Sequence, residues 1–270
     1  MPELPEVETT KRGVEPYLLN NRITKCWHSG LSLRVPFDSS KFNLIKNDLI
    51  TGIDRIAKYI VLHFKNKNRL VIHLGMTGNL RVSNFLKKVK HDHIVMNLKN
   101  GNYLIYNDPR RFGLVSILAK EEQFAMLDNN ADDPFSAKMT PKLLLSKIEN
   151  KNSTIKAILL NNKIISGIGN IYACEVLFSS GISPFTLGKD IDLEQCKKIL
   201  KNAKKILNSA IKSGGTTLKD YFNAEAKPGY FKIKLKVYDR EGEKCTACKN
   251  LITRSVQNNR STFHCLNCQS

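Results

Sequence analysis

The sequence lacks an apolar run long enough to cross a bilayer, since a spanning helix needs about 20 consecutive apolar residues. It shows no basic amphipathic segment of the kind that anchors proteins to membrane surfaces. The first ten residues have neither the basic region nor the apolar stretch of a secretory signal. Internal repeats and low-complexity tracts are absent as well. These absences argue against a membrane partner and lead us to expect a cytoplasmic protein.

Acidic residues are also scarce. The 270 residues include 43 Lys and Arg but only 24 Asp and Glu, which gives a formal net charge of +19. The hydrophobic fraction of 41% and the charged fraction of 25% are otherwise ordinary for a globular protein. A charge of this size on a folded composition favours a polyanionic partner, most often nucleic acid. A basic surface that serves only solubility is the alternative.

Four of the seven cysteines form two CxxC pairs near the end of the chain, Cys245 with Cys248 and Cys265 with Cys268. Two such pairs can wrap four thiolates tetrahedrally around one Zn²⁺, and disulfides are the less expected use in a cytosolic protein. Four thiolates leave no open position on the metal, so this zinc would be structural. The remaining cysteines are scattered and are expected to be small buried hydrophobes; they are Cys26, Cys174 and Cys196.

The first half of the chain predicts one helix followed by β-structure. Apolar residues between Leu4 and Leu18 have helical spacing, and the helix should end near Asn20. Turn signals then join runs typical of strands, which makes residues 22–118 a set of antiparallel hairpins in a sandwich or barrel. The runs expected as strands are residues 23–27, 52–64, 69–76, 93–98 and 103–107.

The second half is mainly helical. A polar stretch with two prolines, residues 129–141, indicates a domain boundary. Helices are expected at residues 141–148, 154–160, 171–179 and 192–213, then a loop over 214–230 and a half-buried strand over 231–239. The fold class is therefore α+β, divided into residues 1–130, 131–235 and a zinc module, 236–270.

Two short motifs carry further chemistry. Gly167 and Gly169 precede a helix, where free backbone amides attract phosphate, and Asn170 either caps this helix or binds a phosphate. At the N-terminus, removal of Met1 would leave Pro2 as a secondary amine, and α-amines titrate near pH 8. Attack of this amine on a sugar aldehyde gives an iminium that acts as an electron sink, with Glu3 available to shuttle protons. The alternative is a simple lead-in to the first helix.

The stretch MPELPEVETT resembles the N-terminus of bacterial formamidopyrimidine-DNA glycosylase, which excises 8-oxoguanine and ring-opened purines. The resemblance runs along the whole chain, and its further blocks stand in the family's order. They are IAKYI, HLGMTG, KHDH, NDPRRFG, GIGNIYA, GGTTLKDY, KPGYF and the closing CxxC pairs with RSTFHC between them. The resemblance implies a helix–two-turn–helix in the helical domain, a zinc-finger β-hairpin, one structural Zn²⁺ and a monomer that binds double-stranded DNA.

The resemblance also implies roles for individual residues. Pro2 would be the Schiff-base nucleophile, and Glu3 the acid/base that assists departure of the damaged base. Lys58, in the strand that carries IAKYI, would donate a proton for β-elimination, and Arg260 would serve δ-elimination and hold a phosphate. Further residues match the family's DNA contacts: His91, Arg110, Lys151 and Asn170.

A base taken out of the stack leaves a hole, and apolar wedges can fill such a hole. Met76, Arg110 and Phe112 match the family's void-filling trio, whereas the residues read alone would place Met76 and Phe112 in a hairpin core. The loop at 214–230 resembles the segment that covers the everted purine.

Two departures from the family and two alternative functions remain open. Lys249 stands where the family often has glycine, and Cys174 stands at a variable family position. The sister group, endonuclease VIII, removes oxidised pyrimidines and usually starts PEGPE, so PELPE favours purines. A non-catalytic, zinc-bearing protein that binds damaged DNA is the alternative from another class. The leading hypothesis is a DNA glycosylase and AP lyase that needs no redox cofactor and no catalytic metal.

Overall fold

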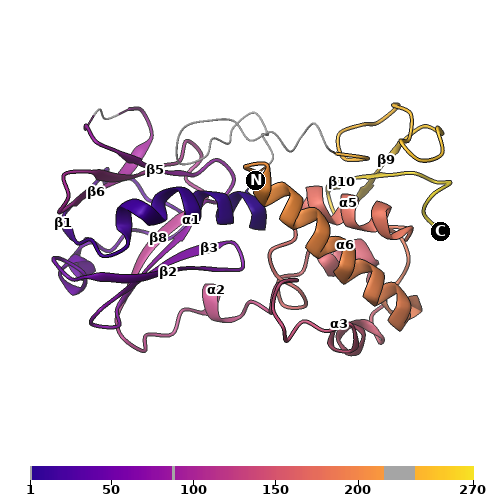
Figure 1. Cartoon of the computed structure of the whole chain (residues 1–270), viewed down its shortest axis with the longest axis horizontal. Helices are drawn as coiled ribbons and strands as arrows, with labels where there is room; N and C mark the ends of the chain where they lie inside the picture. The colour runs from indigo at the N-terminus through magenta and orange to yellow at the C-terminus, as the bar shows by residue number, and fades with distance from the viewer. Residues whose placement is uncertain (1, 87–88, 216–234) are drawn as a thin grey trace. The chain divides into compact units, whose positions relative to one another are not determined.

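The computed structural model describes residues 2–86, 89–215 and 235–270. Contacts divide the chain into two compact units (Figure 1). The first contains Met1–Asp128 with the segment that begins at Ile211, and the second contains Asn129–Ala210 with the C-terminal segment to Ser270. Among the helices of the described residues, none is long and apolar enough to cross a membrane.

The first unit opens with helix α1, Leu4–Leu18. Glu3 and Glu6 form a capping box, in which each side chain accepts a hydrogen bond from the other residue's backbone N–H. This arrangement satisfies donors that a helix start otherwise leaves without partners. The helix ends at Leu18, two residues before the predicted end, and Asn20 then takes a positive φ of 60°.

Two four-stranded antiparallel sheets follow, as the sequence predicted. The strands of one sheet run in the order β1 (Ile23–His28), β6 (Asp92–Leu98), β7 (Tyr103–Asn107), β5 (Asn79–Ser83). The other sheet has the order β2 (Ile50–Ile56), β3 (Tyr59–Phe64), β4 (Arg69–His73), β8 (Leu114–Leu118). A short 3₁₀ helix, η1 (Ser39–Leu44), connects β1 to β2.

The core of this unit contains residues of both sheets and of α1, which is the arrangement of a β-sandwich. Along β3, Ile60 and Leu62 belong to this core. The alternate residues Tyr59 and Val61 lie in a second buried cluster, together with Leu127 of the short helix α2 (Ala125–Asp128). Both faces of β3 are therefore covered, which explains its continuous apolar run.

The single strand predicted over residues 52–64 is wrong, because it is a hairpin in the structure. β2 and β3 are antiparallel neighbours, and the turn between them is Ala57–Lys58, with Ala57 at a φ of 53°. Lys58 thus lies in a turn and not in a strand. Strands β5 and β8 had no counterpart among the predicted strands, since their short apolar stretches lie beside loops rich in glycine and arginine.

The second unit contains the predicted helices α3 (Pro141–Ile148), α4 (Ile155–Leu159) and α5 (Asn170–Ser180), a 3₁₀ turn η2 (Gly188–Asp190), and all but the last two residues of the predicted helix α6 (Leu193–Lys212). Thr140 and Thr154 cap α3 and α4 by accepting hydrogen bonds from Leu143 N and Ala157 N. Gly181, with a φ of 69°, ends α5 in the left-handed conformation. The hairpin of β9 (Thr253–Gln257) and β10 (Arg260–His264) completes the unit.

The strand predicted over residues 231–239 is not found in the part that the structure describes. Residues 231–234 lie outside the described residues, and Leu235–Asp239 form bends and a turn. Three consecutive backbone N–H groups of this turn, those of Lys236, Val237 and Tyr238, donate to the buried Glu175 carboxylate of α5. Of the predicted loop over 214–230, only Gly214 and Gly215 lie within the described residues.

Gly113 has no room for a side chain. A Cβ at this position would overlap the hydroxyl of Tyr106, which lies in the sandwich core, and the carbonyl of His73. We expect Gly113→Ala to lower the free energy of unfolding by about 1–3 kcal/mol, the range for overpacking a core. Urea unfolding measures this loss, and Gly52→Ala is the control because its new methyl would meet His63 at an ordinary 3.9 Å. Equal unfolding midpoints for the two variants would contradict the packing argument.

Candidate active site

The start of α1 is buried. Pro2, Glu3 and Glu6 are all buried, and Glu3 and Glu6 are each 2% exposed. The backbone N–H of Glu3 donates to Oε2 of Glu6 at 2.9 Å. Gly215, with a φ of 85°, approaches Glu6 so closely that a Cβ on it would lie 3.3 Å from Cγ of Glu6. Glu6 therefore holds the backbone of Glu3 in place.

Lys58 is 7% exposed in the β2–β3 turn. Arg55 braces this turn, because its Nη1 donates to the carbonyl of Ala57 at 2.9 Å while its Nε donates to Glu8 of α1 at 3.0 Å. Burial raises the pKa of Glu8, but Arg12 and Arg55 outweigh that effect and hold the pKa below its ordinary value. One partly buried ion pair thus ties the turn that carries Lys58 to the helix that begins beside Glu3.

His73 is a residue beside Lys58 that the sequence reasoning missed, although it belongs to the quoted HLGMTG block. Burial, followed by the charges of Arg34 and Lys58, lowers the pKa of His73 to about 3, so the ring is neutral at pH 7. Its Nδ1 accepts the N–H of Gly75 at 3.0 Å. Nε2 is therefore the protonated ring nitrogen. In the sequence, the signal that could have identified His73 was its position at the end of a buried strand, next to a glycine turn.

Asp108 joins three of the loops in which the sequence places DNA contacts. This fully buried carboxylate accepts from the hydroxyl of Thr77 at 2.6 Å and from the backbone N–H of Gly113 at 2.9 Å. The backbone N–H of Asp108 donates to the carbonyl of His91 at 3.0 Å. Thr77 in turn accepts the N–H of Arg110 at 3.2 Å. The loops of Met76, His91 and Arg110 are therefore held in one arrangement.

The side chains of the predicted void-filling trio are exposed at the ends of these loops. Met76 is 37% exposed and Phe112 is 44% exposed, so the interpretation of both as hairpin core residues is wrong. The guanidinium carbon of Arg110 lies 4.7 Å from the centre of the Phe112 ring, within the range of a cation–π contact. His91 is partly buried and has a φ of 72°. Exposed apolar groups on a braced scaffold suit contact with a partner rather than packing in the core.

The four C-terminal cysteines come together in the second unit. All four Sγ atoms lie within 4.8 Å of one another, with Cys245 to Cys268 at 3.9 Å and Cys248 to Cys265 at 3.4 Å. Tetrahedral thiolates with metal–sulfur bonds of about 2.3 Å would be separated by about 3.8 Å. The backbone N–H of Asn250 is the main group that lowers the pKa of Cys248, to about 6. The cluster thus fits a bound metal ion.

The hairpin next to this cluster presents Arg260. Asn258 and Asn259 both have positive φ angles, 48° and 58°, which is the geometry of a two-residue hairpin turn. Arg260 follows directly and is exposed. The carbonyl of the next residue, Ser261, accepts hydrogen bonds from Lys156 Nζ and from Asn170 Nδ2, both at 2.9 Å. Helices α4 and α5 therefore fix the end of the hairpin at which Arg260 stands.

Lys156 is a second residue that the sequence reasoning missed. It is 1% exposed, and its Nζ also donates to Thr262 Oγ1 at 2.7 Å. Burial lowers the pKa of Lys156. The signal in the sequence was faint, since one lysine in a five-residue apolar helix resembles a solvated position. The structure shows instead a buried cation that braces the Arg260 hairpin.

Asn170 and Lys151 lie in the helical unit. Gly169 and not Asn170 is the N-cap of α5, so the expectation that Asn170 caps this helix is wrong. The Oδ1 atom of Asn170 is buried without a hydrogen-bond partner among the described residues. Lys151 is exposed in the loop after α3.

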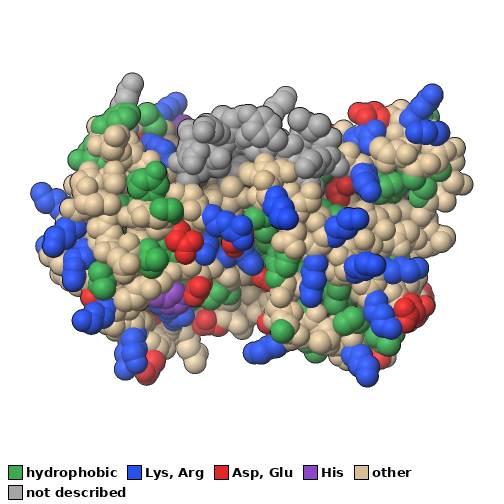
Figure 2. Space-filling model, in the orientation of Figure 1, with side chains coloured by type: hydrophobic (Ala, Val, Ile, Leu, Met, Phe, Trp, Pro, Cys, Tyr) green, Lys and Arg blue, Asp and Glu red, His purple; other side chains and the backbone are tan. Residues whose placement is uncertain are grey.

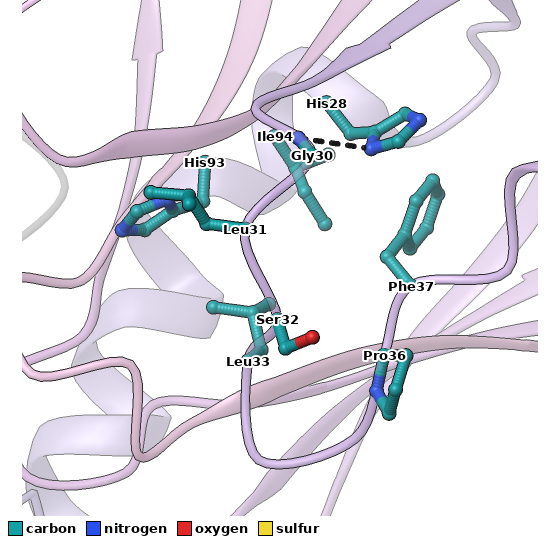
Figure 3. A pocket seen from close by; sticks show the side chains of 9 residues that line it. All are labelled: His28, Gly30, Leu31, Ser32, Leu33, Pro36, Phe37, His93 and Ile94. Atoms are coloured by element: carbon teal, nitrogen blue, oxygen red, sulfur yellow. Dashed lines mark hydrogen bonds between the residues drawn. The ribbon is translucent and has the colours of Figure 1, made fainter.

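A small pocket in the first unit is a poor candidate for the site. It is lined by His28, Leu31, Phe37 and His93 among others (Figure 3). Three of the four ring nitrogens of its histidines already have partners: His93 contacts Ser29 Oγ at 2.9 Å and the carbonyl of Asp108 at 3.1 Å. His28 Nδ1 accepts the N–H of Gly30 at 3.3 Å. The pocket thus offers few groups to orient a ligand.

Two family models match the chain. Residues 1–115 match the formamidopyrimidine-DNA glycosylase N-terminal domain, and residues 131–221 match the formamidopyrimidine-DNA glycosylase H2TH domain. The formamidopyrimidine-DNA glycosylase of Legionella pneumophila (strain Lens) is 43% identical over 271 residues, which cover 100% of this chain and 98% of that protein. The chain belongs to the formamidopyrimidine-DNA glycosylase family. The enzyme of Rickettsia bellii (strain OSU 85-389) is 41% identical over 275 residues, covering 100% and 99% of the two chains.

Solved structures of formamidopyrimidine-DNA glycosylases (Fpg, also MutM) have the same fold. The MutM (Fpg) protein of Thermus thermophilus superimposes with a TM-score of 0.89 at 31% identity, over 99% of this chain and 98% of that one. Lactococcus lactis Fpg in complex with DNA that contains an abasic site gives a TM-score of 0.88 at 28% identity, with 100% of both chains covered. The predicted α+β fold, with a helical region and a C-terminal hairpin beside four clustered cysteines, is confirmed.

Asp108→Asn tests whether the loops of Met76 and Arg110 depend on the buried carboxylate. An amide keeps the shape but replaces one acceptor oxygen with a donor, so Thr77 or Gly113 loses its partner. We expect a loss of about 1–3 kcal/mol in the free energy of unfolding, the cost of a buried unsatisfied group. Backbone amides of residues 75–78 and 108–113 should also exchange hydrogen faster. Asp54→Asn is the control because the side chain of Asp54 is 68% exposed; equal exchange in both variants would disprove the role of Asp108.

Proposed function

We propose that this member of the family is a bifunctional DNA glycosylase that removes oxidised purines, 8-oxoguanine and formamidopyrimidines, and then cleaves the strand as an AP lyase. The observation that carries the proposal is the buried pair Pro2 and Glu3 at the start of α1, in the same unit as the buried Lys58. The PELPE start supports purines rather than the pyrimidines of the sister group. The names of the relatives agree with this substrate.

The chemistry begins at the nitrogen of Pro2 after removal of Met1. The amine attacks C1′ of the damaged nucleotide, the bond from C1′ to the base breaks, and Glu3 supplies the proton that assists departure of the base and opening of the sugar. The product is a charged iminium between Pro2 and C1′. The iminium draws electrons from C2′, so loss of a C2′ proton expels the 3′-phosphate. Lys58 is the proton donor for this β-elimination, and Arg260 serves the δ-elimination that expels the 5′-phosphate.

The DNA contacts follow from the loops and hairpin described above. His91, Arg110, Lys151 and Asn170 would bind the backbone beside the lesion. Met76, Arg110 and Phe112 would fill the hole left by the everted base, which offsets an unstacking cost of a few kcal/mol. The exposure of Met76 and Phe112 on loops braced by Asp108 supports this role.

The cluster of four cysteines would hold one structural Zn²⁺. Its Sγ distances fit tetrahedral thiolates, and four protein ligands leave no site for catalysis on the metal. The zinc would stabilise the hairpin that carries Arg260, while the reaction itself depends on the side chains and the N-terminal amine.

Zinc content tests this assignment. The purified protein should contain about one Zn²⁺ per chain by elemental mass spectrometry, since the four thiolates form one tetrahedral set. Cys248→Ser should lose most of the metal and lower the melting temperature. Cys26→Ser is the control, because burial raises the pKa of Cys26 to about 12 and this thiol lies outside the cluster. Full zinc in Cys248→Ser would rule out the four-cysteine site.

Borohydride trapping tests the nucleophile. The protein is incubated with a duplex that carries 8-oxoguanine opposite cytosine, reduced, digested and analysed by mass spectrometry. We expect a covalent adduct on Pro2, because reduction of the iminium makes the bond permanent. Pro2→Gly should lose excision at low enzyme concentration and still bind the duplex. Full excision by this variant would refute the role of Pro2.

The same experiment distinguishes the alternatives. An adduct that forms only with an oxidised-pyrimidine duplex would retain the mechanism and change the substrate to that of the sister group. Binding to both duplexes without any adduct would identify a non-catalytic damage-binding protein. Lys58→Gln is a useful companion, since it should slow strand cleavage more than base release.

A further inference from the structure

Helix α6 carries a stripe of lysines that the proposed reaction does not use. Six lysines of this helix are exposed: Lys197, Lys198, Lys201, Lys204, Lys205 and Lys212. At 100° per residue they occupy an arc of about 120° along one side of the helix. Figure 2 shows Lys and Arg side chains gathered where Figure 1 places α6. We name these six residues the α6 lysine stripe.

The positive charge of the stripe is barely neutralised. Glu194 is the one acidic residue within α6, and it pairs with Lys197 at 2.6 Å. The other five lysines form no ion pair within the described part of the chain. Both members of the single pair are more than half exposed, so it contributes little. Like charges crowded on one side of a helix repel one another, which a stable fold tolerates more readily when a polyanion occupies that side.

The opposite side of α6 is apolar and packs against the rest of the protein. Cys196, Ile199, Leu200, Ala203, Leu207 and Ala210 are buried. Asn202 donates to the carbonyl of Ser179 at 3.0 Å and to the hydroxyl of Ser180 at 3.1 Å, which attaches the helix to the C-terminal end of α5. α6 is therefore basic and amphipathic, a pattern missed in the sequence. Because its apolar side is buried, it has nothing to insert into a lipid surface.

The dimensions of the stripe fit a nucleic-acid backbone. From Lys197 to Lys212 the helix rises about 22 Å. One strand of duplex DNA places a phosphate every 3.4 Å or so, hence about six phosphates over that length. The stripe is thus long enough to meet several phosphates of one strand, and its lysines carry no group suited to reading bases.

The middle of the stripe lies away from Asn170, the residue at the start of α5 that is expected to bind DNA. Asn170 is the first residue of α5, whereas the bonds of Asn202 reach its last two residues, Ser179 and Ser180. An 11-residue helix is about 16 Å long. The part of α6 around Asn202, in the middle of the stripe, is therefore attached about one α5 length away from Asn170.

We propose that the α6 lysine stripe is a second DNA-binding surface, which binds the phosphate backbone of undamaged duplex independently of sequence and of lesions. The inference rests on the proposed function in taking duplex DNA as the partner. Such a surface keeps the protein on DNA while no lesion occupies the active site, because purely electrostatic contacts allow sliding.

The test compares the wild type with an α6 variant in the salt dependence of their binding to an undamaged duplex of about two helical turns. In the triple variant Lys198→Gln, Lys201→Gln, Lys205→Gln, glutamine keeps the helical preference and removes three charges. Each phosphate contact contributes about 0.9 to the slope of log K against log salt. We expect the slope to fall in magnitude by about 2–3 and the Kd at about 0.1 M salt to rise more than roughly tenfold.

A matched control separates a binding surface from net charge. Lys46→Gln, Lys65→Gln, Lys99→Gln removes the same charge from exposed positions of the first unit and should leave the slope close to that of the wild type. An equal slope in the α6 variant and the wild type would overturn the proposal. So would loss of binding to phosphatidylglycerol vesicles in the α6 variant with the duplex slope unchanged, since that result would assign the stripe to lipid.

The two proposals fail separately. Borohydride trapping on Pro2 of the wild type examines the proposed reaction, whereas the slope is measured on DNA without a lesion. Absent trapping with a reduced slope in the α6 variant would refute the glycosylase and retain the second DNA-binding surface. Trapping with an unchanged slope would retain the glycosylase and refute the surface.

Discussion

A reagent at the end of a chain must be held more firmly than chain ends usually are, because the first residues of most domains fray. In this protein, where Pro2 is the proposed reagent, the reciprocal bonds between Glu3 and Glu6 meet that requirement. They start α1 at Leu4, so that Pro2 and Glu3 stand at the head of a helix whose other end reaches into the sandwich core. The acidic residues at the start of this basic protein thus have different roles: Glu6 holds the start of the helix in place, and Glu3 is proposed to act in the reaction.

A similar solution recurs at the other elements that are proposed to act in the reaction or to bind DNA, where one buried or nearly buried polar group holds a turn, a loop or a hairpin in place. Arg55 braces the turn of Lys58, Asp108 braces the loops of Met76 and Arg110, and Lys156 braces the hairpin of Arg260. Each bracing group is buried or nearly so and has several partners, so its removal leaves unsatisfied donors or acceptors inside the protein. The groups proposed to meet DNA are thereby placed without having to be packed themselves.

The sequence predicted the framework well, for identifiable reasons. Helical spacing located α1, α3 and α6, because a single buried face repeats every few residues, and apolar runs joined by turn signals located β6 and β7. It failed where tertiary contacts decide the outcome. The apolar run over 52–64 has no turn residue at Ala57 and Lys58, yet it folds as a hairpin that Arg55 braces. Met76 and Phe112 are apolar, as core residues are. They are exposed because they lie on loops that the hydrogen bonds of Asp108 hold in place. Lys156 cannot be told from a solvated lysine without the hairpin beside it, since its partners are 105 and 106 residues away.

Charge follows a different logic from packing. A net charge of +19 indicates that the surface suits a polyanion, but it does not indicate which part of the surface binds it. Lys58 and Lys156 are buried, so they contribute little to the electrostatic field outside the protein. Burial also lowers the pKa of Lys156. Long-range attraction must therefore come from exposed lysines, which attract phosphates at any sequence. α6 concentrates six of them on one side of a helix that is anchored by its apolar face. The proposed chemistry and the proposed general attraction thus depend on different lysines, so that a change of Lys58 should alter strand cleavage, while changes in the α6 lysine stripe should alter how long the protein stays on DNA.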